Sequence, residues 1–288
     1  KYDPVLKPLK PAEPEGYLGA IDSTGSRVIA ITRSLPLRGF MAVISITNDL
    51  AGIQEFNLGE FTKKSFNEFL KGSLSSAEFP IVAAPGAYCV RLLKENASLS
   101  KKLLKPLPQG YHDFENEFGD VQWNAPGPII YQHIKEDELK DNWRLLKDSG
   151  TLHQINPFST WFLNAQDVRK YVSSIKESQE SRIVLLPDQK EARLNNIYRR
   201  ALEELFPEEI RLLWKTRLEE MAYILLETGK EKEAKTAVRA AIDLKNPFSA
   251  IDPNPFIWNL LLKSIYVLMD GNYEKTEKEK ESSIIITS

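Results

Sequence analysis

Basic side chains between residues 188 and 205 have the types and spacing that best suit a binding chemistry. Arg193 and Arg200 are seven residues apart and therefore share one face of a helix, and Lys190 lies one turn before Arg193. Such side chains bind phosphate or carboxylate groups. Three nearby glutamates weaken the positive field, so a solvated charged face is the alternative interpretation. We predict Lys190, Arg193 and Arg200 as a candidate anion-binding set.

Four acidic residues lie close together in the sequence between residues 113 and 120. Carboxylates are the ligands that hard divalent cations prefer. The group lacks the positional pattern of a calcium loop, and Gly119 falls at the wrong place for one. We therefore interpret these four residues as solvated loop charges: Asp113, Glu115, Glu117 and Asp120.

Histidine and cysteine are scarce. His112, His133 and His153 are the three histidines, and no helical or tight-turn spacing gathers them as metal ligands. Cys89, the one cysteine, lies on the apolar face of a predicted helix, where a buried and unreactive thiol is expected. A cysteine nucleophile served by one of the histidines is the alternative. With one cysteine, no internal disulfide can form.

The sequence motifs of common enzymes are missing. There is no phosphate loop, no dinucleotide-binding glycine pattern and no serine in a nucleophile-elbow arrangement. We predict no catalytic residue, metal site or cofactor, and an enzyme of an unrecognised kind stays open as an alternative.

Composition places the chain among ordinary globular proteins. Its 288 residues suffice for one large or two smaller domains, and its 42% hydrophobic and 27% charged residues are typical. The net charge of −2 gives no general reason to bind nucleic acid or an acidic membrane. No apolar run approaches the roughly 20 residues that span a bilayer. We expect a cytoplasmic protein without a membrane partner, and a chain that begins at Lys1 suggests processing or a fragment.

The first part of the chain predicts an α+β domain over residues 17–106, after a proline-rich linker over residues 1–16. Runs rich in β-branched and aromatic residues, separated by turn residues, predict an antiparallel β-meander. The runs are 17–22, 27–34 and 39–47, with 54–58 as a fourth strand. Thr62 or Ser65 can cap a helix that packs across the sheet. An extended segment over 79–85 and a helix from Gly86 follow.

Residues 107–181 are the least regular, and we predict a mixed connecting region there. The run 129–134 suggests a strand, and Leu139, Trp143 and Leu146 suggest a helix that Gly150 ends. Asn164 can cap another helix. Residues 173–181 are polar and typical of a turn.

Residues 182–272 predict a helical domain, followed by a polar tail over residues 273–288. A buried strand over 183–186 precedes a helix over 188–205 and a second that starts at Pro207. The second helix runs into a helical hairpin that Gly229 divides and Pro247 stops. A further apolar helix over 256–269 is suited to cover the hairpin.

The hairpin, over about residues 215–247, resembles one tetratricopeptide repeat. Ala222 and Ala234 are small enough to let the two backbones approach closely. Leu218 stands where the repeat prefers tryptophan, and Leu225 where it prefers tyrosine. The repeat's small, turn and terminal positions would fall on these residues, with the proline one residue late: Ala222, Gly229, Ala234, Ala241, Leu244 and Pro247. One copy is present, whereas roughly three are needed to bury a continuous core, so a plain helical hairpin is the alternative.

Two functions follow from these features. The hairpin and the proline-rich linker favour a non-catalytic protein-interaction or scaffold module, with a protein as its partner. The alternative is binding of an anionic ligand or nucleic acid through the sheet face and the Arg193/Arg200 helix, helped by the lysines near residue 102.

Overall fold

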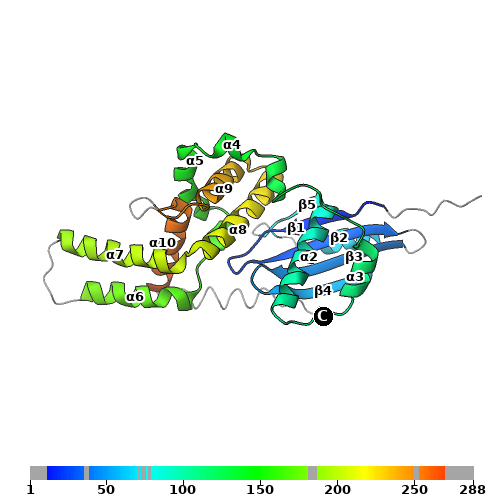
Figure 1. The fold of residues 1–288 in the computed structure, drawn as a ribbon, viewed down its shortest axis with the longest axis horizontal. Helices are drawn as coiled ribbons and strands as arrows, with labels where there is room; N and C mark the ends of the chain where they lie inside the picture. Colours follow the sequence, from blue (N-terminus) through cyan, green and yellow to red (C-terminus); the bar gives the residue numbers. More distant parts are fainter. Residues whose placement is uncertain are drawn as a thin grey trace, which may run out of the picture. The chain divides into compact units, whose positions relative to one another are not determined.

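The chain folds into an antiparallel sheet followed by helices, which confirms the predicted α+β class (Figure 1). The computed structural model describes residues 12–35, 39–70, 72, 76, 79–180, 187–248 and 253–269. Two compact units divide the chain. Unit 1 holds the described residues of Lys1–Ile134 together with Glu220–Ala234, and unit 2 holds those of Lys135–Glu219 and Lys235–Ser288. Unit 1 thus continues past the predicted boundary at residue 106 and includes part of the hairpin.

The sheet of unit 1 is a meander with one added strand. Its order is β4-β3-β2-β1-β5, with every pair antiparallel. The strands are β1 Glu15–Gly19, β2 Ser26–Leu35, β3 Gly39–Asn48, β4 Gly52–Glu60 and β5 Ile81–Pro85. The predicted meander is confirmed, and the extended segment 79–85 becomes β5 by pairing with β1. Because β1 begins at Glu15, the sheet starts inside the predicted linker; residues 1–11 lie outside the described part of the chain.

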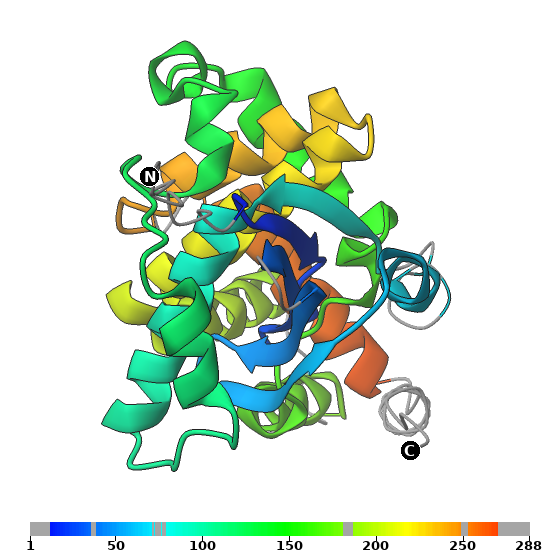
Figure 2. The same ribbon diagram turned by 90° about the vertical axis from the view of Figure 1, so that its right-hand side faces the viewer.

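Helices pack on both faces of this sheet. On one face, Ala30 and Ala42 contact Phe66 of helix α1 (Lys63–Phe69), which is capped by Thr62 as predicted. Residues one step along each strand, such as Ile31 and Val43, point to the opposite face. There α2 (Gly86–Lys102) crosses the strands, with α3 (Tyr111–Phe118) beside β4. Figure 2 shows α2 and α3 on one side of the strands and α1 on the other.

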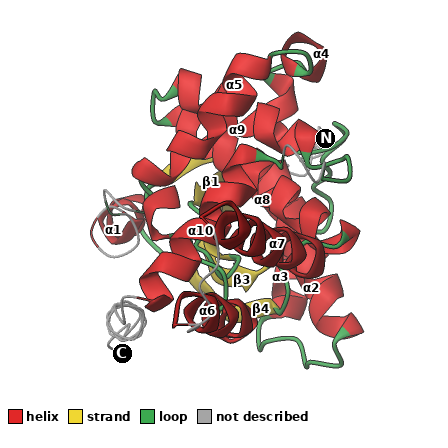
Figure 3. Ribbon diagram, turned by 90° about the vertical axis from the view of Figure 1, so that its left-hand side faces the viewer, coloured by secondary structure: helices red, strands yellow, loops and turns green. Residues whose placement is uncertain are grey.

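Unit 2 is helical and has an aromatic core. Trp161 packs against Phe158, Trp214 and Phe256, with ring centroids 4.8, 5.5 and 6.1 Å apart. α6 packs along α7 and also contacts α10 (Figure 3). Apart from its share of the hairpin described below, its helices are α4 Glu136–Leu139, α5 Trp143–Asp148, α6 Ala165–Glu180, α7 Pro187–Leu205 and α10 Pro255–Met269. In the described part of the chain, no helix has the length and apolar character needed to cross a bilayer.

The hairpin consists of α8 (Glu208–Glu227) and α9 (Glu231–Asp243), with Gly229 at φ 81° between them. The N–H groups of Gly229 and Lys230 donate to the carbonyls of Leu226 and Leu225, which closes α8 as a left-handed cap. Ala222 and Ala234 are both fully buried. α9 ends at Asp243, before the predicted stop at Pro247.

Four predictions for the middle of the chain were wrong. The run 129–134 holds a short 3-10 helix, Ile129–Gln132, in place of a strand, since a brief apolar run does not distinguish the two. The predicted turn over 173–181 continues α6 to Glu180. The acidic group lies largely on α3 rather than in a loop.

The predicted helix around Trp143 is divided, because Asn142 caps a separate helix, α5. Two more 3-10 helices follow at Ser149–Gln154 and Phe158–Thr160. The predicted strand 183–186 and the tail 273–288 lie outside the described residues.

Candidate functional site

A buried ion pair joins β2 to the segment of α8 that belongs to unit 1. Arg27 Nη1 donates to Glu220 Oε2 at 2.8 Å, and the side chains are 8% and 6% exposed. The Tyr88 hydroxyl of α2 donates to the other Glu220 oxygen. Burial, followed by the negative charge of Glu220, raises the pKa of Tyr88 far above its usual value. This cluster is enclosed and holds three elements of unit 1 together.

Cys89 adjoins the cluster, and its environment suppresses thiol chemistry. The side chain is fully buried, and burial raises the pKa of the thiol to about 12, although the Arg27 charge opposes the shift. His133 lies against Tyr223 in unit 1, and His112 is exposed on α3. His153 lies in unit 2, stacked on Phe256. Among the described residues, no three His, Cys, Asp or Glu side chains are grouped to hold a metal ion.

The acidic group has a structural contact within unit 1. Asp120 accepts two hydrogen bonds from the Arg33 guanidinium, at 2.9 and 3.1 Å. These bonds lower the pKa of the Asp120 carboxyl. Arg33 also donates to the backbone carbonyl of Ala12 at 2.8 Å, so it fixes the start of the described chain to the turn after α3.

The predicted anion-binding residues Lys190, Arg193 and Arg200 all lie exposed on α7. Arg200 Nε donates to Glu204 at 2.6 Å, and Glu204 also accepts bonds from Lys170 and Tyr171 of α6. The bond from Arg200 comes first among the contacts that lower the pKa of Glu204 to about 2. Arg200 is therefore paired with a carboxylate of the same helix, whereas Lys190 and Arg193 face solvent.

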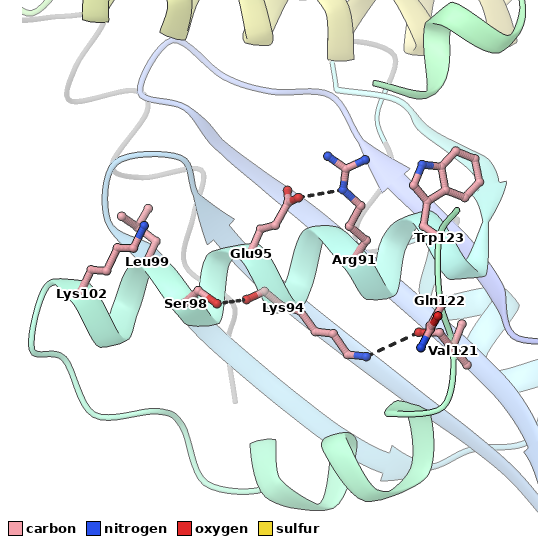
Figure 4. A pocket seen from close by; sticks show the side chains of 9 residues that line it. All are labelled: Arg91, Lys94, Glu95, Ser98, Leu99, Lys102, Val121, Gln122 and Trp123. Carbon is pink, nitrogen blue, oxygen red and sulfur yellow. Dashed lines mark hydrogen bonds and ion pairs between the residues drawn. The ribbon is translucent and has the colours of Figure 1, made fainter. Parts of the chain in front are cut away.

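An open basic groove runs along the outer face of α2 in unit 1. Its volume is about 540 Å³. Figure 4 shows the side chains that line it. The helix contributes residues at three- and four-residue steps, which lie on one face. The lining residues are Arg91, Lys94, Glu95, Ser98, Leu99, Lys102, Val121, Gln122 and Trp123. We call this feature the α2 groove.

The α2 groove carries three cations and one carboxylate. Glu95 is paired with Arg91 at 2.7 Å, so its charge is offset by the neighbouring guanidinium. Lys94 Nζ donates to the carbonyls of Gly119 and Val121, at 3.2 and 3.5 Å, which leaves its positive charge without a carboxylate partner in these contacts. Lys102 lies at the far end of the helix (Figure 4). The arrangement provides separated positive charges along one wall.

Trp123 closes the other end of the α2 groove. Its ring packs edge-on against Tyr88 at 5.1 Å, and its indole nitrogen is buried. Arg91 is held close by, because its guanidinium donates to the carbonyl of Gly127 at 3.0 Å. An aromatic surface beside fixed cations suits an anionic group that carries a nonpolar part.

The helix half of this site had a signal in the sequence. Arg91, Lys94, Ser98 and Lys102 recur on one face, opposite the apolar stripe of the same helix, and only the lysines near residue 102 entered the sequence-based alternative. Val121, Gln122 and Trp123 had no such signal, because tertiary packing brings them to α2.

No protein-family model, curated protein or solved structure matches this chain.

Proposed function

We propose that the protein is a non-catalytic interaction module that binds an acidic segment of a protein partner in the α2 groove. The observation that carries the proposal is the row of cations Arg91, Lys94 and Lys102 on one exposed helix face, opposed by a single carboxylate that is already paired.

The spacing of these cations favours an extended peptide over a small anion. Arg91 and Lys102 are eleven residues apart, which is roughly 16 Å along a helix. One phosphate cannot contact both ends, whereas an extended segment of about five residues covers this distance. A carboxylate at one end of the segment would contact Arg91 or Lys94, and a carboxylate at the other end would contact Lys102.

Burial of the hairpin also supports this choice. Every residue from 217 to 225 is buried, as are Ala234 and the stretch 236–242 of α9. The repeat-like hairpin has little free surface there on which a peptide could lie. α2 and α3 pack on one face of the sheet, and α1 packs on the other face around Ala30 and Ala42, so helices of unit 1 occupy part of the surface that a ligand on the sheet would need.

A binding titration tests the proposal. The probe is a fluorescein-labelled hexaglutamate peptide, followed by anisotropy at low salt, with hexalysine as the opposite-charge control. We expect binding that weakens as salt is added, because the contacts are solvent-exposed charges. Lys94→Glu with Lys102→Glu should weaken it at least tenfold.

The matched control changes the net charge equally on another surface. Lys190→Glu with Arg193→Glu should leave peptide binding within twofold of the unmodified protein. An equal loss from both double variants would show a nonspecific charge effect and overturn the proposal. A loss confined to the α7 variant would support the alternative site on α7, and tighter binding of a single-stranded oligonucleotide would favour the nucleic-acid alternative.

A further inference from the structure

The end of α2 has a leucine in a backbone conformation that favours glycine. Leu104 has φ 57° and is the one non-glycine residue with positive φ among those the structure describes. The N–H groups of Leu104 and Lys105 donate to the carbonyls of Lys101 and Ser100, at 3.0 and 2.9 Å. α8 ends with the same pair of bonds, but Gly229 occupies the equivalent position. Leucine there is strained, since its Cβ crowds the backbone.

Packing in unit 1 does not offset this strain. The Leu104 side chain is 93% exposed, and its neighbour Leu103 is 44% exposed. A strained and exposed apolar residue contributes little to the stability of the fold. We therefore infer that its exposed side chain has a function.

A third exposed leucine lies at the same end of unit 1. Leu50, 57% exposed, lies in the turn between β3 and β4. That turn is seated against α2, because Ile53 N–H donates to Ser100 Oγ at 2.9 Å and Lys105 Nζ donates to Ala51 O at 3.1 Å. Gly52 permits the contact, since a Cβ there would lie 2.2 Å from Ser100 Oγ. We call Leu50, Leu103 and Leu104 the leucine tip.

Lysines surround the leucine tip. Lys101, Lys102 and Lys105 are all exposed and flank Leu103 and Leu104 in the sequence. Asp49, half-buried beside Leu50, is the acidic residue next to the tip in the sequence. The tip therefore combines projecting apolar side chains with a locally positive charge, although the whole chain carries −2.

We propose that the leucine tip inserts into the surface of a membrane that contains anionic lipids. Leucines that project from a turn and a helix end can enter the boundary between headgroups and acyl chains, while lysines beside them remain level with the phosphates. The attraction depends on the charge near the tip rather than on the net charge of the chain, because salt screens charges that lie more than about a Debye length from the membrane. A peripheral contact of this kind needs no membrane-spanning helix. This proposal does not rest on peptide binding in the α2 groove, although Lys102 belongs to both places.

Vesicle co-sedimentation of the whole chain tests the proposal. The vesicles are phosphatidylcholine alone, and phosphatidylcholine with about a third phosphatidylserine. We expect binding to the anionic vesicles only. Lys101→Ala should weaken it about fivefold, the effect of one lysine near a charged surface. Leu104→Gln should weaken it several-fold, whereas Leu212→Gln, a matched change of an exposed leucine on α8 of unit 2, should have no effect.

Leu104→Gly separates function from stability. Glycine relieves the backbone strain, so we expect a higher midpoint of thermal unfolding together with weaker vesicle binding. Leu104→Cys carrying an environment-sensitive dye reports insertion directly, because the native Cys89 is buried. We expect a blue shift of emission with anionic vesicles.

The proposal would be overturned by any of these vesicle results: no sedimentation with anionic vesicles, equal sedimentation of Leu104→Gln, or an unshifted dye. Hexaglutamate binding that Leu104→Gln abolishes would also overturn it and assign the tip to a protein partner. Leu104 and Lys101 do not line the α2 groove, so these variants should leave the peptide assay unchanged if both proposals hold.

Discussion

Arg27 and Glu220 form a buried ion pair, with Arg27 Nη1 2.8 Å from Glu220 Oε2, although 193 residues separate them in the sequence. The pair lies inside unit 1 and connects the sheet to α8. Loss of one partner leaves a buried charge without compensation.

We expect Glu220→Gln to lower the free energy of unfolding by about 3 kcal/mol, because Arg27 then lies uncompensated in a buried site. Urea denaturation measures the change. Glu95→Gln breaks the more exposed pair with Arg91 and should cost at most about 1 kcal/mol. An equally small loss for Glu220→Gln would mean that the buried pair does not stabilise unit 1.

The Cys89 thiol should resist alkylation in the folded protein. Burial blocks access and raises the pKa of the thiol to about 12, so little thiolate exists at pH 8. Iodoacetamide labelling followed by mass spectrometry should show modification only after unfolding. Cys89→Ser with Ser98→Cys places the thiol on an exposed position of the same helix and should label readily. Labelling of native Cys89 at a similar rate would contradict the burial.

His153 should make stability depend on pH. Burial lowers the pKa of His153 from 6.5 to about 4, against the opposing bond to the Phe256 carbonyl. Well above pH 6.5 the ring is neutral in both the folded and the unfolded state, so it does not change the free energy of unfolding. As pH falls from 6.5 to 4, the unfolded chain binds a proton that the native ring does not, so stability falls by about 2–3 kcal/mol.

Urea midpoints between pH 4 and 7 measure this dependence. His153→Gln should flatten the profile in that window relative to the unmodified protein. His112→Gln, a change of an exposed histidine, should leave the slope as it is. A slope that His153→Gln does not alter would assign the effect to other groups.

Gly229→Ala should destabilise the protein by about 1 kcal/mol, since φ is 81° there and alanine is strained in that region. The surrounding space is open, so the cost comes from the backbone rather than from a clash. Thermal unfolding measures the change. Gly72→Ala, also in open space but without positive φ, should be neutral or slightly stabilising. Similar losses at both glycines would argue against backbone strain as the cause.

Local signals predicted many of the secondary-structure elements. Runs of β-branched residues between turns predicted the first three strands, and Thr62 marked the start of α1. Gly229 separated α8 from α9, because few other residues adopt its φ without cost. The wrong predictions, such as a strand at Ile129–Gln132 and a turn where α6 continues, fall where short apolar or polar runs suit more than one conformation.

The order and type of most elements could be predicted from the sequence, since those depend on side chains a few residues apart. The contacts between residues far apart in the sequence could not be predicted in this way: β5 beside β1, Glu220 on Arg27, Trp123 at the end of the α2 groove, and Leu50 at the same tip as Leu104. The physical reason is that burial of apolar surface is non-directional. A hydrophobic pattern states which face of an element is covered, and close packing of the whole unit then selects the partner.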